Sequence, residues 1–152
     1  MNKSFVVACI PAYNEEDYIG GVVSNTLKFV DKVVVCDDGS GDKTCSIAKD
    51  MGAHVIMHNQ KLGYGASLQS LFKEARRLKA DFVVTLDGDN QHNPDEINLL
   101  LERLKTGDVD IVIGSRFLPY GSSDTPKWRE NGIKLITSIV KNNGLQLTDA
   151  QS

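Results

Sequence analysis

The chain alternates short apolar segments with amphipathic ones, and this alternation restricts its fold more than any other feature. Apolar runs rich in β-branched residues predict strands, at 4–10, 32–37, 53–58, 81–87 and 110–115. Helical spacing and helix-start residues predict helices, over 18–30, 39–52 (after a turn), 64–79, 93–107 and 127–143. Strands that alternate with helices indicate an α/β domain of three layers, with a mostly parallel sheet flanked by helices.

Composition narrows the class of protein. The 152 residues suffice for one domain, so we expect a single domain over 1–152. A net charge of −3 gives no electrostatic footprint for nucleic acid, and three cysteines do not suggest a disulfide framework. Pro11 interrupts an N-terminal apolar run that is too short for a signal peptide, and no segment reaches the roughly 20 apolar residues of a membrane span. We therefore expect a cytoplasmic protein, which could still act at the cytoplasmic face of a membrane.

Every unusual polar cluster follows a predicted strand. The four clusters are Pro11–Glu15, Asp37–Ser40, Asp87–His92 and Arg116. Ligands of such sheets bind at the carboxyl ends of the strands, so the four clusters are expected to form one site. Asp37 and Asp38 are adjacent, so one can face a ligand while the other stabilises the turn.

The segment "LDGDNQ" contains two carboxylates, Asp87 and Asp89, that can turn toward one cation. Mg²⁺ typically takes one or two carboxylates together with substrate phosphates, and Gln91 can add a neutral oxygen. Gly88 allows a ligand to approach the backbone closely. His92 is expected to hydrogen-bond or pack inside the loop rather than to bind metal. A solvated turn is the alternative interpretation.

Two other classes share an Asp-x-Asp segment. An EF-hand loop would need glycine at His92 and glutamate at Asn98, and both fail. A haloacid-dehalogenase phosphatase has threonine or valine where this chain has Gln91. The glycine-containing segment 59–70 lacks the lysine spacing of a phosphate-binding loop.

Five segments in register resemble family 2 glycosyltransferases of the GT-A fold, and above all the branch of dolichol-phosphate mannose synthase and polyprenyl-phosphate glucose synthases. They are "IPAYNEE", "VCDDGSGDKT", "LGYGASLQ", "TLDGDNQHNP" and "GSRF". The terminal "TDAQS" looks like the start of that branch's D-x-x-S-G-F-R segment, so the domain is expected to be truncated at its C-terminus.

The resemblance implies a role for each matching residue. Pro11, Tyr13 and Glu15 would line the nucleotide pocket, while Cys36 and Asp38 would contact the base or ribose. Cys36 stands where the family usually has an aliphatic residue. Asp87, Gly88 and Asp89 would form the D-x-D motif, Asp89 and Gln91 would be the metal ligands, and Arg116 would contact donor or acceptor phosphate. Asp87, Asp89 and Arg116 are the implied catalytic residues.

The implied reaction is inverting transfer of a hexose from a UDP- or GDP-sugar to a polyprenyl (dolichyl) phosphate, with Mg²⁺ or Mn²⁺ as cofactor. A lipid phosphate is already anionic, so the reaction needs no strong general base. Because such an acceptor is a lipid, the resemblance also implies peripheral contact with a membrane.

Two alternatives stay open. One is a sugar-nucleotidyltransferase, against which the acidic "PAYNEE" argues. The other is a truncated domain that binds nucleotide-sugar weakly and turns over poorly or not at all. The sequence leaves the sugar, the nucleotide and the oligomeric state open.

Overall fold

The computed structural model describes residues 3–114, in which four strands alternate with helices. The strands are β1 (Val6–Ala12), β2 (Lys32–Asp37), β3 (His54–Met57) and β4 (Phe82–Thr85). The helices are α1 (Ile19–Thr26), α2 (Thr44–Asp50), α3 (Tyr64–Arg77), the short 3₁₀ helix η1 (Pro94–Glu96) and α4 (Ile97–Leu104). The chain divides into two compact units, Met1–Leu101 and Glu102–Ser152, and the sheet lies in the first.

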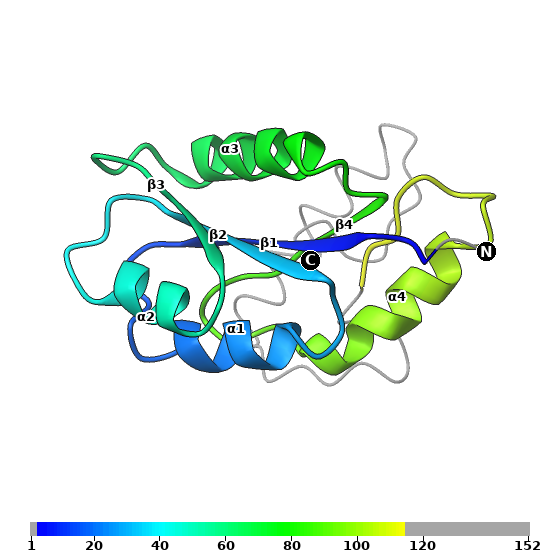
Figure 1. Ribbon diagram of the computed structural model, residues 1–152, viewed down its shortest axis with the longest axis horizontal. Helices are drawn as coiled ribbons and strands as arrows, with labels where there is room; N and C mark the ends of the chain where they lie inside the picture. The colour runs from blue at the N-terminus through cyan, green and yellow to red at the C-terminus, as the bar shows by residue number, and fades with distance from the viewer. Residues whose placement is uncertain (1–2, 115–152) are drawn as a thin grey trace, which may run out of the picture. The chain divides into compact units, whose positions relative to one another are not determined.

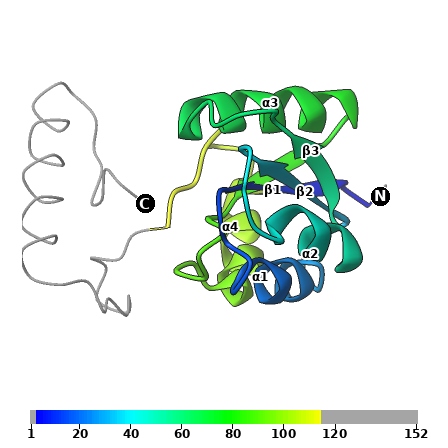
Figure 2. The same cartoon turned by 90° about the vertical axis from the view of Figure 1, so that its left-hand side faces the viewer.

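The four strands form one parallel sheet with the order β3-β2-β1-β4. Helix α3 covers one face of this sheet, and α1 and α2 cover the other, which gives three layers (Figures 1 and 2). The connections run from β1 to β2 and β3 on one side, and the chain then returns to place β4 on the other side of β1. Such a reversal is where open α/β sheets usually bind ligands.

Strand β1 divides the core into two halves because alternate side chains of a strand point to opposite faces. Val6, Ala8, Ile10 and Ala12 pack with α1, with Ala48 of α2, and with Ile97 and Leu101 of α4. Val7 and Cys9 pack instead with Leu71 and Ala75 of α3. Both faces of β1 are therefore covered, which explains why its sequence is an almost continuous apolar run.

The first four predicted strands and the three-layer α/β fold are confirmed. The predicted fifth strand at 110–115 is wrong for residues 110–114, which join no ladder among the described residues. Their apolar run does not make a strand, since a strand needs a hydrogen-bonded neighbour. Position 115, the predicted loop at 118–126 and the helix at 127–143 lie outside the described part.

All four described α-helices are shorter than predicted, and local contacts account for the ends of three of them. Helix α1 stops at Thr26 because the amides of Lys28 and Phe29 bond carbonyls three residues back and tighten the turn. Helix α2 begins at Thr44, whose amide and hydroxyl both donate to the Asp42 carboxylate. The 93–107 segment begins as η1, capped by Asn93, and the helix ends at Leu104. No helix within residues 3–114 combines the length and apolarity that a membrane crossing requires.

Two neighbouring glycines in α1 provide a test of this packing. A Cβ added to Gly21 meets no described atom within 4 Å, whereas one added to Gly20 lies 3.1 Å from Ile47 Cγ2. Gly21→Ala is therefore expected to raise the free energy of unfolding by about 0.5–1 kcal/mol, the usual gain of alanine over glycine in a helix. Gly20→Ala is expected to gain clearly less, because Ile47 must move. Urea denaturation of both variants checks this; an equal gain would contradict the α1–α2 contact.

Candidate functional site

The loop after β1 is tied to the loop after β2 by side chains of both. The Asn14 amide donates to Ser40 Oγ at 2.9 Å, and the Gly41 amide donates to Asn14 Oδ1 at 2.9 Å. The Glu15 amide donates to the buried Thr44 hydroxyl at 2.8 Å. Asn14 has φ of 56°, a left-handed conformation that asparagine tolerates better than most residues. These bonds fix where the Glu15 side chain leaves the backbone.

Gly88 brings the "DGD" segment against the end of β1. A Cβ added there would lie 3.3 Å from the Pro11 carbonyl oxygen and 3.5 Å from both Ala12 Cβ and Glu15 Cγ. Gly88 is buried, so the backbones approach closely at this point, as glycine permits. The structure thus places the predicted residues Pro11, Glu15 and Gly88 side by side, at the point where the strand order reverses.

The carboxylates at this point concentrate negative charge. Partial burial raises the pKa of Glu15, and the nearby charges of Asp89, Asp42 and Asp87 raise it further. Every charge that acts on Glu15 in this way belongs to another carboxylate. Burial likewise raises the pKa of Tyr64, and the neighbouring Asp87 carboxylate adds to the effect. Carboxylates gathered at a strand end are a suitable donor set for a divalent cation.

The residues around Asp89 form a tight turn. The Gln91 amide donates to Asp89 Oδ1 at 3.0 Å, and Asn90 between them has φ of 64°. The Asp87 amide donates to His92 Nδ1 at 3.1 Å, so the prediction that His92 hydrogen-bonds inside the loop is confirmed. No three His, Cys, Asp or Glu side chains in residues 3–114 are grouped to hold a metal ion. A cation here would thus need oxygens from Gln91 or from a bound ligand.

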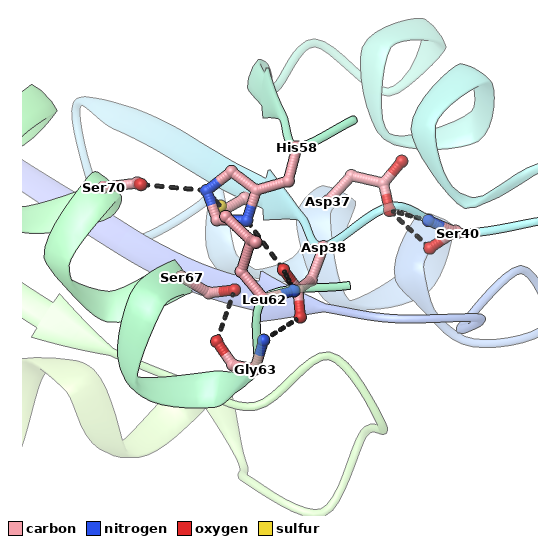
Figure 3. A network of polar contacts seen from close by, with 9 residues as sticks. Asp37, Asp38, Ser40, His58, Leu62, Gly63, Ser67 and Ser70 are labelled. Carbon is pink, nitrogen blue, oxygen red and sulfur yellow. Dashed lines mark hydrogen bonds and ion pairs between the residues drawn. The ribbon is translucent and has the colours of Figure 1, made fainter. Parts of the chain in front are cut away.

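Asp37 stabilises the turn, as was expected of one of the two adjacent acids, whereas the Asp38 carboxylate is engaged by other residues of the chain (Figure 3). Asp37 accepts from the amide and hydroxyl of Ser40 and so closes the turn. Asp38 is only 4% exposed, and its carboxylate accepts from the Leu62 amide at 2.9 Å, the Gly63 amide at 2.7 Å and His58 Nδ1 at 2.7 Å. Burial raises the pKa of Asp38, yet these hydrogen bonds outweigh it, and the pKa is lowered overall.

Three residues in or beside the loop between β3 and α3 belong to this region and were missed by sequence reasoning. They are His58, Lys61 and Tyr64. Lys61 Nζ lies 3.8 Å from the centroid of the exposed Tyr13 ring, and Tyr64 lies beside Asp87. A usable signal was available: His58 ends the third predicted strand, level with Asp38 in a parallel sheet. The predicted residue Arg116 lies outside the described residues.

Gly39 is the point where the β2 turn meets this loop. Its φ is 74°, and an added Cβ would lie 2.7 Å from the Gln60 carbonyl carbon and 2.9 Å from Gln60 Cα. Both atoms are backbone, so neither can rotate away. The glycine of "DDGS" is therefore required twice, for conformation and for space.

Comparison with known proteins places the chain in a family. Residues 7–150 match the model of glycosyl transferase family 2. The UDP-N-acetylglucosamine–dolichyl-phosphate N-acetylglucosaminyltransferase of Methanococcus voltae is 32% identical over 174 aligned residues, covering 100% of this chain and 68% of that protein. The dolichol-phosphate mannosyltransferase of Pyrococcus furiosus is 35% identical over 124, covering 76% of this chain but 34% of its own length.

A solved structure supports the same conclusion. Glucosyl-3-phosphoglycerate synthase of Mycobacterium tuberculosis, in complex with Mn²⁺, uridine diphosphate and glucosyl-3-phosphoglycerate, superposes with a TM-score of 0.59 at 28% identity. The match covers 69% of this chain and 41% of that one. The fold is thus that of the GT-A glycosyltransferases, and the chain belongs to glycosyl transferase family 2.

The role of Gly39 is testable with a matched glycine in the same turn. Gly39→Ala is expected to lower the free energy of unfolding by about 2–3 kcal/mol, because it combines a left-handed φ with a backbone clash. Gly41 has no positive φ and no described atom within 4 Å of an added Cβ, so Gly41→Ala is expected to stay within about 0.5 kcal/mol. Chemical denaturation measures both. Equal effects would show that the loop does not pack on Gly39.

Proposed function

We propose that this chain binds a nucleotide-diphosphate sugar and transfers its hexose, with inversion, to a polyprenyl phosphate. The observation that carries the proposal is the convergence of Glu15 with the "DGD" segment at the reversal of strand order. The relatives named for dolichyl phosphate support a lipid-phosphate acceptor, and therefore contact with a membrane surface. The donor is a UDP- or GDP-sugar.

We assign the metal ligands to Asp89 and Gln91. The residues fit a hard divalent cation, since neighbouring carboxylates raise the pKa of Glu15 and a cation would offset their charge. When bound together with the donor, Mg²⁺ or Mn²⁺ would offset the charge that builds on the leaving diphosphate. Support for this type of cofactor comes from neighbours of the same fold solved with Mn²⁺ or Mg²⁺ and uridine diphosphate.

The remaining residues bind and orient the donor. Pro11, Tyr13 and Glu15 line the nucleotide side of the site, where Tyr13 is 38% exposed and carries Lys61 over its ring. The Cys36 side chain is fully buried, so its contact with the nucleotide would come from the backbone. Asp38 accepts three hydrogen bonds, and a carboxylate has about four lone-pair sites, which leaves it one for a base or ribose donor.

The proposed reaction requires little proton transfer by the protein. The bond from the anomeric carbon to the diphosphate oxygen breaks while a phosphate oxygen of the acceptor bonds to the opposite face of that carbon. Positive charge develops on the sugar, as in other oxocarbenium-like reactions. The carboxylate of Asp87 is placed beside Gly88 and Tyr64, where it can orient the donor. Arg116 is proposed to contact the donor or acceptor phosphate.

Removal of one carboxylate tests the metal assignment. We expect Asp89→Asn to weaken Mn²⁺-dependent binding of UDP-sugar by at least about tenfold, while the weak binding without Mn²⁺ stays unchanged. The control is Asp50→Asn, an exposed carboxylate at the far end of α2, which is expected to bind as the wild type.

Calorimetric titration of UDP-glucose, GDP-mannose and UDP-N-acetylglucosamine, with and without Mn²⁺, measures these affinities and names the donor. Metal-independent binding that Asp89→Asn leaves intact would contradict the metal assignment. Failure of every donor to bind the wild type would contradict the proposed function itself.

A further inference from the structure

His58 is the centre of a polar network that no role in the proposed transfer yet explains. Its side chain is only 10% exposed. Nδ1 lies 2.7 Å from Asp38 Oδ1, and Nε2 lies 2.9 Å from Ser70 Oγ and 3.6 Å from Cys36 Sγ (Figure 3). The network therefore links the ends of β2 and β3 with the first turns of α3.

The proton positions in this network follow from the partners. The Asp38 carboxylate only accepts, since its lowered pKa keeps it ionised, so Nδ1 of His58 carries a proton and donates it. Nε2 is then the nitrogen that meets the Ser70 hydroxyl. The two ring nitrogens thus have different partners, and only Nδ1 acts on Asp38.

Asp38 passes this constraint to the loop. One carboxylate oxygen takes both His58 Nδ1 and the Leu62 amide, and the other takes the Gly63 amide. Gly63 has φ of 96°, so the chain turns sharply here into α3. If the Asp38 carboxylate rotated away, it would release both amides. Its hydrogen bond from His58 opposes that rotation.

The loop held in this way and the start of α3 carry two side chains that lie beside residues of the proposed donor site. Lys61 lies over the Tyr13 ring, and Tyr64 lies beside Asp87. Lys61 and Tyr64 flank the two amides that Asp38 binds. The position of this loop therefore decides how both side chains meet a donor.

We propose that His58 is a positioning residue for donor binding: through Nδ1 it fixes the Asp38 carboxylate, which holds the Leu62–Gly63 amides and so directs Lys61 and Tyr64 toward the donor. This inference rests on the proposed function for its effect on the donor, whereas its effect on the loop stands apart from it.

The order Ser70, His58, Asp38 also has the spacing of a nucleophilic triad, but the surroundings oppose that use. Such a triad needs backbone N–H groups free to stabilise an oxyanion. Within this network the amides of Leu62 and Gly63 are not free for that role, because both donate to Asp38. The network holds the loop in place, and we assign Ser70 no nucleophilic role.

Two substitutions of His58 can distinguish the role of Nδ1 from that of Nε2. Asparagine at position 58 can present an N–H near the place of Nδ1, whereas glutamine presents its amide near the place of Nε2. His58→Asn is thus expected to keep the bond to Asp38, and His58→Gln to lose it. Ser70→Ala removes the partner of Nε2 alone and is the control for general damage to the network.

Two measurements on the full chain decide the question. Hydrogen exchange of the Leu62 and Gly63 amides, followed by NMR, is expected to accelerate about tenfold in His58→Gln and to change by less than about threefold in His58→Asn and Ser70→Ala. Calorimetric titration of UDP with Mn²⁺ is expected to show the same order, with affinity about tenfold lower in His58→Gln only.

The outcomes separate the effect of His58 on the loop from its effect on donor binding. Equal exchange in all variants, or equal loss of UDP affinity in His58→Asn and His58→Gln, would overturn the role of His58, because a merely structural residue gives no such difference. Failure of UDP to bind the wild type would overturn the proposed function, and with it the role of His58 in donor binding. The exchange rates would still decide whether His58 holds the loop.

Discussion

Strand β1 is the constraint on which the rest of the structure depends. All seven of its residues are buried, it pairs in parallel with β2 on one side and β4 on the other, and it separates the two halves of the core. Because its neighbours run in the same direction, the segments that follow β1, β2 and β4 must all emerge at one edge. The proposed site is a consequence of that register, and any slip of β1 would scatter its residues.

The acids at this edge fall into two groups that differ in how their charge is balanced. Asp37 and Asp38 accept hydrogen bonds from Ser40, His58 and loop amides, and they shape the turn and the loop. The carboxylates of Asp87 and Asp89 instead act on Glu15 as like charges and raise its pKa. The fold thus satisfies some acids with its own donors and holds others close enough to raise the pKa of Glu15, and a cation bound there would offset that negative charge.

Much of this could be predicted from the sequence, because the signals are local. Apolar β-branched runs and helical spacing gave four strands and their order along the chain, and polar residues after each strand indicated one edge. Helix ends were less predictable: α2 begins at Thr44, whose amide and hydroxyl bond the Asp42 side chain, a contact that the sequence pattern does not show. The level of His58 with Asp38 could have been inferred from a parallel sheet. The contact of Gly39 with Gln60 depends on how a loop folds back, which residue spacing does not encode. Composition alone can also mislead: the apolar run at 110–114 predicted a strand, and the described residues form none there.

Paramagnetic broadening by Mn²⁺ tests the central claim of one metal-and-donor site at the carboxyl edge most directly. Mn²⁺ is added with UDP to isotope-labelled protein, and amide signals are followed by NMR. We predict that the signals of Glu15, Gly88 and Gln91 disappear first, while those of Asp31 and Asp81, which precede β2 and β4 at the opposite edge, persist. Broadening that reaches Asp31 or Asp81 as early as Gly88, or that spares Gly88, would contradict the account.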